Sequence, residues 1–196
     1  MTNTVLDYLQ GRGVPFLVLP RPHAAGPEQT AAAHGVDTAE LVRSHALMYR
    51  FGAAVMVTPW TRPLDLDLAR TTLDDEGARF AEVHELQGLA AGCTPDSLPP
   101  LGLWLQAPLF VDLAVAQLTQ VVFPAGRAAT LVCMQRTDLF RDEPYAVSVL
   151  TDASRHEAAR AGLLTATAAR ALTEEDLLPV HVVERRRAGR ERSGAA

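Results

Sequence analysis

The sequence SHALMYRFGAAVMVTP, residues 44–59, decides the fold class of this chain. SHALMYR and AAVMVTP are apolar runs of strand length, and only Phe51 and Gly52 separate them. Two such runs around a short glycine-containing break are typical of a β-hairpin. We therefore predict two strands joined by a tight turn at Phe51–Gly52.

Apolar runs on both sides of the hairpin predict further strands, and the segments between them predict short helices. The predicted strands are VPFLVLP (14–20), RFAEV (79–83), LFVD (109–112), TQVVF (119–123), ATLVCMQ (129–135) and YAVSVL (145–150). The predicted helices are TVLDYLQGRG (4–13), GPEQTAAAHG (26–35), DTAELV (37–42), LDLDLARTTL (64–73) and HELQGLAAG (84–92).

Two of these helices carry clear start and stop signals. Gly26 and Pro27 suit the N-cap and the first helical position, and Gly35 suits the end of the same helix. Asp37, followed three residues later by Glu40, resembles a capping box. We therefore expect two short helices in succession before the hairpin.

Strands dominate the middle of the chain, and no long series of alternating strands and helices is present. A glycine-rich phosphate fingerprint and a P-loop are also absent from the sequence. These patterns predict a mixed α/β fold with a largely antiparallel sheet, closing into a barrel-like core with short flanking helices.

The composition changes from Thr151 onward. DASRHEAARAGLLTATAARAL is alanine-rich and helical in character, TEEDLL opens a further short helix, and VHVVE has the composition of a strand. RRRAGRERSGAA is a charged tail that we expect to be mobile. The predicted organisation is a domain over 1–150, a helical and strand extension packed on it over 151–184, and an arginine-rich tail over 185–196.

Composition excludes several classes of protein. With 48% hydrophobic and 21% charged residues, the chain has the balance of a globular protein, and no apolar run reaches the roughly 20 residues that a membrane span needs. The N-terminus lacks the pattern of a secretory signal, and two cysteines provide neither a disulfide framework nor a metal cluster. We expect a cytoplasmic protein without a membrane partner, metal or cofactor.

All 18 basic residues are arginines, so no step of any reaction here uses a lysine side chain. The net charge of −5 argues against broad binding of nucleic acid, and we expect no DNA partner. The arginine-rich tail offers local contacts to a phosphate backbone, or is a solubilising end.

A stiff loop, CTPDSLPPLG, occupies residues 93–102. Its three prolines exclude a helix or a central strand, because proline lacks the backbone N–H and constrains the residue before it. A rigid loop suits a corner of the fold or one wall of a binding site.

The order of several segments resembles the YbaK/prolyl-tRNA synthetase-associated editing domains, which are trans-acting aminoacyl-tRNA deacylases. RPHAAGPEQTAAAHGVDTAELVRS precedes the hairpin, and RFAEVHELQGLAAGCTPDSLPPLG leads into APLFVDLAV and VVFPAGRAATLVCMQRTDL. The resemblance covers roughly residues 1–150 and depends on the order and spacing of these segments.

This resemblance implies a barrel-like sheet with a pocket between the hairpin and the proline loop. In the family the pocket holds the aminoacyl ester at the 3′ end of a tRNA and removes a wrongly attached small amino acid. Backbone N–H groups of the loop and a lysine at the start of the hairpin position the substrate, and the terminal hydroxyl of the tRNA helps to activate water. An aminoacyl-tRNA synthetase is a further candidate partner.

Two positions depart from the family pattern. The lysine position falls at Arg43, which keeps the charge and can donate two parallel hydrogen bonds but cannot act as a base. The first glycine of the loop motif is Asp96. Its carboxylate would repel a hydroxide-like nucleophile, or would instead bind the α-ammonium group of the substrate.

Carried over by resemblance, the predicted catalytic residues are Arg43 and Gly102. The predicted substrate-binding residues are His23, His45, Asp96, Ser97, Leu98, Pro99, Pro100 and Gly126. Each has a structural alternative: a helix-end arginine for Arg43, a structural or surface histidine for His45 and His23, and a fold corner or a glycine-only turn for the loop residues and Gly126. Ser44, His84 and Asp112 have stronger structural explanations than functional ones, and for Asp112 that explanation is a helix N-cap.

The predicted function is a trans-editing aminoacyl-tRNA deacylase that hydrolyses the ester of a mischarged small amino acid. The alternative is a catalytically degenerate relative that binds an aminoacyl-adenosine-like ligand or a protein partner. A third hypothesis is a purely structural or regulatory protein whose activity lies in the C-terminal 45 or so residues.

Overall fold

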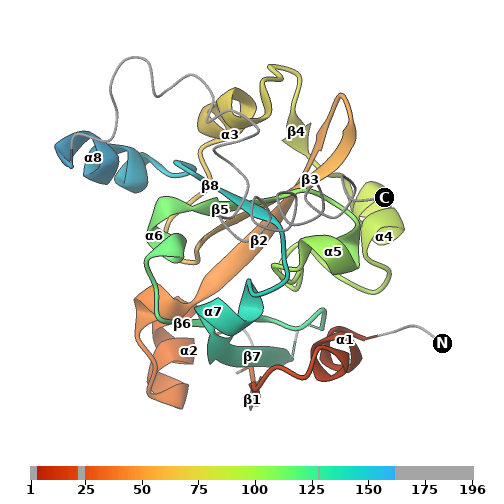
Figure 1. Ribbon diagram of the computed structural model, residues 1–196, viewed down its shortest axis with the longest axis vertical. Helices are drawn as coiled ribbons and strands as arrows, with labels where there is room; N and C mark the ends of the chain where they lie inside the picture. The colour runs from red at the N-terminus through yellow and green to blue at the C-terminus, as the bar shows by residue number, and fades with distance from the viewer. Residues whose placement is uncertain (1–3, 22–24, 128, 162–196) are drawn as a thin grey trace, which may run out of the picture.

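The computed structural model describes residues 4–21, 25–127 and 129–161. Within these residues the chain forms short helices between the strands of two sheets (Figure 1). The strands are β1 (Leu17–Pro20), β2 (Val42–Tyr49), β3 (Gly52–Pro59), β4 (Arg79–Phe80), β5 (Leu109–Asp112), β6 (Gln120–Pro124), β7 (Thr130–Gln135) and β8 (Tyr145–Ser148). The helices are α1 (Val5–Gly11), α2 (Pro27–His34), η1 (Thr38–Glu40), α3 (Leu66–Leu73), α4 (Val83–Leu89), α5 (Gly102–Leu105), α6 (Leu113–Ala116), α7 (Arg136–Leu139) and α8 (Asp152–Arg160).

The predicted hairpin is confirmed as β2 and β3, which are antiparallel along their whole length. Tyr49 is paired with Gly52, so the turn consists of Arg50 and Phe51, one residue earlier than predicted. Gly52 opens β3 with a φ of +116°, a value that side chains rarely tolerate. The glycine is therefore the first residue of the returning strand, where its positive φ is needed, and is not part of the turn.

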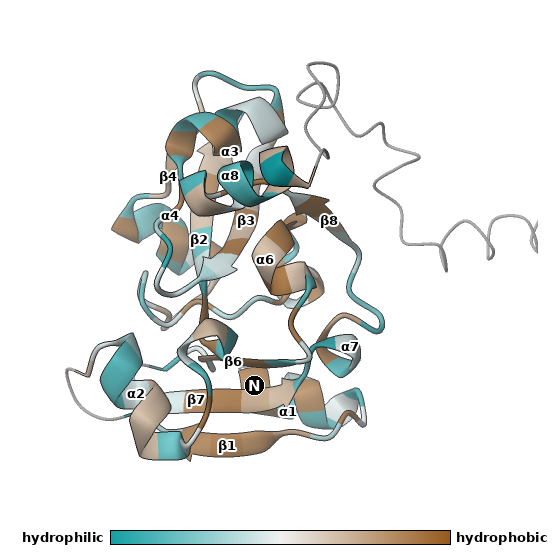
Figure 2. Ribbon diagram, turned by 90° about the vertical axis from the view of Figure 1, so that its left-hand side faces the viewer, coloured by the Kyte–Doolittle hydropathy of each residue, from teal (hydrophilic) through white to brown (hydrophobic). Residues whose placement is uncertain are grey.

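The two sheets differ in their strand directions. The smaller sheet has the order β1-β7-β6 and is antiparallel, whereas the larger has the order β4-β2-β3-β5-β8. In the larger sheet β5 is parallel to both of its neighbours, β3 and β8. Both views place the smaller sheet at one end of the molecule, and α3 and α8 lie at the other end (Figures 1 and 2).

A mixed α/β fold with largely antiparallel pairing is confirmed, whereas barrel closure is not. The described strands divide into two sheets, which are joined by an isolated parallel bridge between Leu41 and Val122. No closed barrel is found in this part of the chain. The two sheets stay separate because only Leu41, directly before β2, bridges to β6, and β2 itself does not continue this pairing into a ladder.

The helix boundaries follow the predicted caps. Gly26 is the N-cap of α2, and Gly35 ends it in the left-handed conformation with a φ of +65°. Asp37 and Glu40 form the predicted capping box, although the helix that they begin is the single turn η1. The signals located both ends of α2 and the start of η1 correctly, but the capping box did not determine the length of η1.

The two faces of the β2–β3 hairpin pack against different clusters of apolar side chains. Val55 and Val57 belong to the larger cluster, which includes Leu98 and Leu101 of the proline loop. Leu47 and Met56 belong to a second cluster with α3 and Leu150. This alternation places the proline loop against the hairpin.

The described part of the predicted C-terminal extension is α8 with its cap. Thr151 caps α8, and the buried Ser154 donates a hydrogen bond of 2.5 Å to the carboxylate of Asp112. Asp112 also accepts from the backbone N–H of Leu150 and of Ala114, so its predicted N-cap role at α6 is confirmed. The remaining segment of the extension and the arginine-rich tail lie outside the described residues.

Candidate functional site

Arg43, near the start of β2, meets Asp96 of the proline loop. Its Nη2 atom lies 3.2 Å from Oδ1 of Asp96, so the two groups form an ion pair between the hairpin and the loop. The side chain of Arg43 is 32% exposed and that of Asp96 is 69% exposed. The two positions that depart from the family pattern are therefore direct neighbours.

The strand environment explains how Arg43 reaches the loop. Arg43 is paired with Thr58 of β3, while β4 covers the other edge of β2 only at Leu47 and Met48. The alternative of a helix-end arginine is wrong, because Arg43 lies within β2. Its Nε atom is buried and has no hydrogen-bond partner among the described residues. The guanidinium thus keeps one buried donor that the described residues leave unsatisfied.

A small turn holds Asp96 in place. The N–H of Ser97 donates to the carbonyl of Thr94 at 2.9 Å, and the N–H of Thr94 donates to the Ser97 hydroxyl at 2.7 Å. The N–H of Gly126 donates to the carbonyl of Ser97 at 2.9 Å. The loop is therefore fixed to the turn between β6 and β7.

The side chains that follow Asp96 in the loop point into the protein. Ser97 and Leu98 are 0% and 1% exposed, and Pro99 and Pro100 are also buried. Leu98 packs in the main apolar cluster. Residues 97–100 therefore offer little surface, from side chain or backbone, for contact with a ligand.

Arg21 is a second cation at this site, and the sequence patterns did not indicate it. It follows β1, and its Nη1 atom donates to the backbone carbonyl of Asp96 at 3.2 Å. Its guanidinium also lies over the ring of Trp60, 4.6 Å from the centroid. Arg21 and Asp96 are distant in the sequence, so periodicity and spacing carry no signal for this contact.

His45 lies on the same face of β2 as Arg43, two residues further on. Its Nε2 atom is 3.1 Å from the hydroxyl of Thr58, and its ring is 6.0 Å from the ring of Phe80. Burial, assisted by the positive charge of Arg43, lowers the pKa of His45 to about 4. The imidazole is therefore neutral near pH 7.

Gly102 and Gly126 both have packing reasons to be glycine. A Cβ on Gly102 would lie 2.8 Å from the carbonyl oxygen of Ala107. Gly126 has a φ of +79°, and a Cβ there would lie 3.1 Å from Cγ2 of Val5. The structural alternative for each glycine is therefore supported by its surroundings.

A buried carboxylate beside Gly102 was also missed by sequence analysis. Glu143 accepts a hydrogen bond of 2.8 Å from the Tyr8 hydroxyl and one of 2.9 Å from the N–H of Leu103, and its side chain is 0% exposed. Arg12 lies 3.4 Å from the same carboxylate. Burial and the neighbouring Glu143 raise the pKa of Tyr8 to about 12. Glu143 thus links α1 to the start of α5.

Two further histidines were named from the sequence. His23 lies outside the described residues. His84 has a side chain that is 77% exposed and lies 3.3 Å from Glu82, away from Arg43. Among the described residues, no group of three or more histidine, cysteine, aspartate or glutamate side chains is arranged to hold a metal ion. The described helices include none that is long and apolar enough to cross a bilayer.

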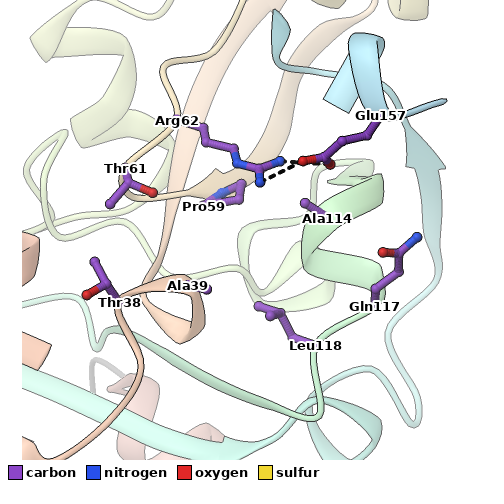
Figure 3. A pocket seen from close by; sticks show the side chains of 9 residues that line it. All are labelled: Thr38, Ala39, Pro59, Thr61, Arg62, Ala114, Gln117, Leu118 and Glu157. Carbon is purple, nitrogen blue, oxygen red and sulfur yellow. Dashed lines mark hydrogen bonds and ion pairs between the residues drawn. The ribbon is translucent and has the colours of Figure 1, made fainter. Parts of the chain in front are cut away.

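Two hollows of the described surface lie away from Arg43. One, of about 400 Å³, lies between η1, the end of β3, α6 and α8, and the bidentate pair of Arg62 and Glu157 borders it at 2.9 and 3.0 Å (Figure 3). The other, of about 500 Å³, is mostly apolar. It is lined by Gly102, Leu103, residues 106–110 and residues 144–146. Gly102 thus borders a hollow that Arg43 does not line.

Comparisons with known proteins agree on the fold. The chain is similar to the crystal structure of a candidate trans-editing enzyme for prolyl-tRNA synthetase, with 22% identity and a TM-score of 0.67 over 76% of this chain and 94% of the other. A hypothetical protein gives 21% identity and a TM-score of 0.65, over 76% of this chain and 99% of the other. A candidate signal transduction protein from Marinobacter aquaeolei is 21% identical, with a TM-score of 0.56 over 81% of this chain and 34% of the other.

Identities this low establish a shared fold alone. Among the curated proteins, the comparison finds no match. The sequence profile of the aminoacyl-tRNA editing domain matches residues 21–142, which is more than half of the chain and contains Arg21, Arg43, His45 and Asp96. The chain therefore belongs to the aminoacyl-tRNA editing domain family.

Proposed function

We propose that this protein is a trans-editing deacylase that hydrolyses the ester of a mischarged small amino acid on tRNA. The observation that carries the proposal is the contact between Arg43 of the hairpin and Asp96 of the proline loop. This contact joins the two segments that a YbaK-like enzyme would use to enclose the ester. Family membership supports editing of aminoacyl-tRNA in general.

In the proposed reaction, water attacks the ester carbonyl carbon and the carbon–oxygen bond to the tRNA ribose breaks. The ribose hydroxyl leaves with a proton, and the free amino acid is the second product. Negative charge develops on the carbonyl oxygen in the transition state, so a positioned donor lowers the barrier. We assign this role to Arg43, whose guanidinium is partly exposed and lies beside the proline loop.

The proline loop has few backbone donors to offer. Pro99 and Pro100 have no N–H, and the N–H of Ser97 is already bonded to Thr94. Gly102 then belongs to the site as the residue that allows the close turn beside Ala107, rather than as a group that touches the ester. The loop's main contribution in this proposal is to hold Asp96 against Arg43.

The other residues of the cluster have supporting roles in this proposal. Neutral His45 fixes the orientation of Thr58 and supplies no positive charge at pH 7. Arg21, stacked on Trp60, is a cation at the edge of the site that suits a phosphate of the unpaired 3′ end. The proposed binding set also includes Gly126, and His23, which lies outside the described residues.

The proposal extends to the organisation of the chain. The partner is the aminoacyl-tRNA 3′ end, with a synthetase as a second candidate, and the proposed compartment is the cytoplasm. The proposed editing domain is residues 1–150, and the C-terminal extension over 151–184 packs on it. The hydrogen bond between Ser154 and Asp112 supports that packing for the first turn of α8.

The test is a deacylation assay with tRNA charged with Ala, Ser, Cys or Pro. We expect hydrolysis above the buffer rate for at least one of them. Arg43→Ala should lower kcat for that substrate by about 100-fold, since loss of one oxyanion donor typically costs ~3 kcal/mol. Arg50→Ala, at the exposed hairpin turn, is the matched control and should leave the rate unchanged. No release from any charged tRNA contradicts the proposal.

The degenerate binding protein is the second candidate, because Asp96 occupies a donor of Arg43. The double variant Arg43→Lys with Asp96→Gly restores the family pattern. If hydrolysis occurs only in this variant, the natural chain is a binder of an aminoacyl-adenosine-like ligand or a protein partner. Hydrolysis by the natural chain excludes this candidate.

A further inference from the structure

The Arg43–Asp96 pair presents two opposite charges side by side at the surface of the protein. Arg21 holds the backbone carbonyl of Asp96 at 3.2 Å, and the turn from Thr94 to Ser97 fixes the residue from both sides. The backbone that carries the Asp96 side chain is therefore held by the fold, and the ion pair with Arg43 orients the carboxylate.

The pair is unequal in exposure. The carboxylate of Asp96 is 69% exposed and the Arg43 side chain is 32% exposed, so Asp96 forms the outer part of the pair. One contact, between Nη2 and Oδ1 at 3.2 Å, joins them. A single exposed contact of this kind contributes about 1 kcal/mol or less, so a ligand can rearrange it at little cost.

An aminoacyl ester carries the complementary pair of groups. Its α-ammonium nitrogen is two bonds from the carbonyl carbon, so an ammonium and a carbonyl oxygen are presented side by side. Asp96 can accept charge-assisted hydrogen bonds from the ammonium, while Arg43 donates to the carbonyl oxygen. Binding of this kind exchanges the ion pair within the protein for two polar contacts with the ligand.

Resting on the proposed function, we infer that Asp96 is the receptor for the free α-ammonium group of the substrate. The enzyme therefore selects aminoacyl esters whose amine is free and rejects N-acylated ones, including peptidyl esters. A different role for the same carboxylate is a plug that only shields Arg43. The two roles predict opposite effects when the charge is removed.

The experiment compares alanyl-, seryl-, cysteinyl- and prolyl-tRNA with their N-acetyl forms, as kcat/KM above the buffer rate. We expect the full-length protein to prefer the free amine by about tenfold or more, the effect of one charge-assisted hydrogen bond. Asp96→Asn should remove this preference by lowering kcat/KM for the free amine, leaving the N-acetyl form unchanged. Asp74→Asn is the matched control, because Asp74 is another exposed aspartate that pairs with an arginine of the hairpin, Arg50.

A binding arm separates this inference from the deacylase proposal. The probes are 3′-alanylamino-3′-deoxyadenosine, whose amide resists hydrolysis, and its N-acetyl form, titrated calorimetrically. Tighter binding of the free amine that is lost in Asp96→Asn supports the inference even when no ester is hydrolysed. Equal binding and equal hydrolysis of both forms overturn it while the deacylase proposal stands. A rise in both rates in Asp96→Asn identifies the plug and also overturns it.

Discussion

At the scale of single residues, Arg43 and His45 show how neighbours on one strand face divide their roles. Arg43 remains partly exposed and charged, whereas His45 is largely enclosed by Thr58 and Phe80. The charge of Arg43 adds to the burial of the imidazole in keeping His45 neutral. The pair thus holds one positive charge at pH 7, on the guanidinium.

The neutral state of His45 predicts a pH dependence of stability. The pKa of His45 is about 4 when folded and about 6.5 when unfolded, so above pH 6.5 both states are neutral and its contribution to stability is fully present. As the pH falls from 6.5 towards 4, only the unfolded chain gains the proton, and the folded state loses up to about 3 kcal/mol. Urea unfolding between pH 7 and 4 measures this loss.

His45→Gln is the control for that titration. Glutamine can still bond to Thr58 but does not titrate, so the decline of stability between pH 6.5 and 4 should become shallower. An identical decline in both proteins would show that other groups are responsible.

At the scale of elements, the start of α5 is fixed by close packing. Gly102→Ala places a Cβ 2.8 Å from the backbone oxygen of Ala107 and 3.0 Å from Cβ of Leu109. We expect a loss of about 1–3 kcal/mol in the free energy of unfolding, the usual cost of overpacking. Gly88→Ala in α4 is the matched control, because its Cβ meets nothing within 4 Å and should stabilise the helix.

A second prediction at this scale concerns the carboxylate that joins α1 to α5. Glu143→Ala removes the acceptor of the Tyr8 hydroxyl and of the N–H of Leu103, and it leaves Arg12 with the carbonyl of Leu139 and the more distant Asp142. We expect a loss of about 3 kcal/mol or more, because a buried cation then loses its buried carboxylate partner. Asp142→Ala, which removes an exposed carboxylate 3.8 Å from the same Arg12, should cost about 1 kcal/mol or less. Similar losses in the two variants would contradict the role of Glu143.

Local signals in the sequence predicted the elements better than their contacts. The hairpin and the cap at Asp37 depend on neighbouring residues, and both were found correctly. The contacts of Arg21 with Asp96 and of Tyr8 with Glu143 join residues that are far apart in the chain, so no periodicity indicates them. The proximity of Arg43 and the proline loop followed from the family resemblance and not from any pattern of residues.

At the scale of the whole molecule, Asp112 connects the end of β5 with α6 and with the approach to α8. Asp112→Ala removes the acceptor of Ser154 and of the N–H groups of Leu150 and Ala114, all in a buried place. We expect a loss of about 3 kcal/mol from these unsatisfied groups, together with faster hydrogen exchange in α8.

The outer connection of α8 should matter less. Arg62→Ala breaks the ion pair between Arg62 and Glu157. The side chain of Arg62 is 31% exposed and that of Glu157 is 45% exposed. A cost of about 1 kcal/mol or less is expected, with little change in exchange. If Arg62→Ala releases α8 as strongly as Asp112→Ala, the buried carboxylate is not what fastens it.

The pairing of β1 with β7 determines when the smaller sheet can form during synthesis of the chain. Leu17 stands opposite Cys133, so the first strand leaves the ribosome long before the strand that completes its sheet. The hairpin, whose two halves are neighbours in the chain, can form while translation continues. Leu17 and Val18, which are 65% and 51% exposed even in the finished fold, must remain unpaired in the nascent chain until then. We therefore expect this apolar segment to bind a chaperone while the chain is being synthesised.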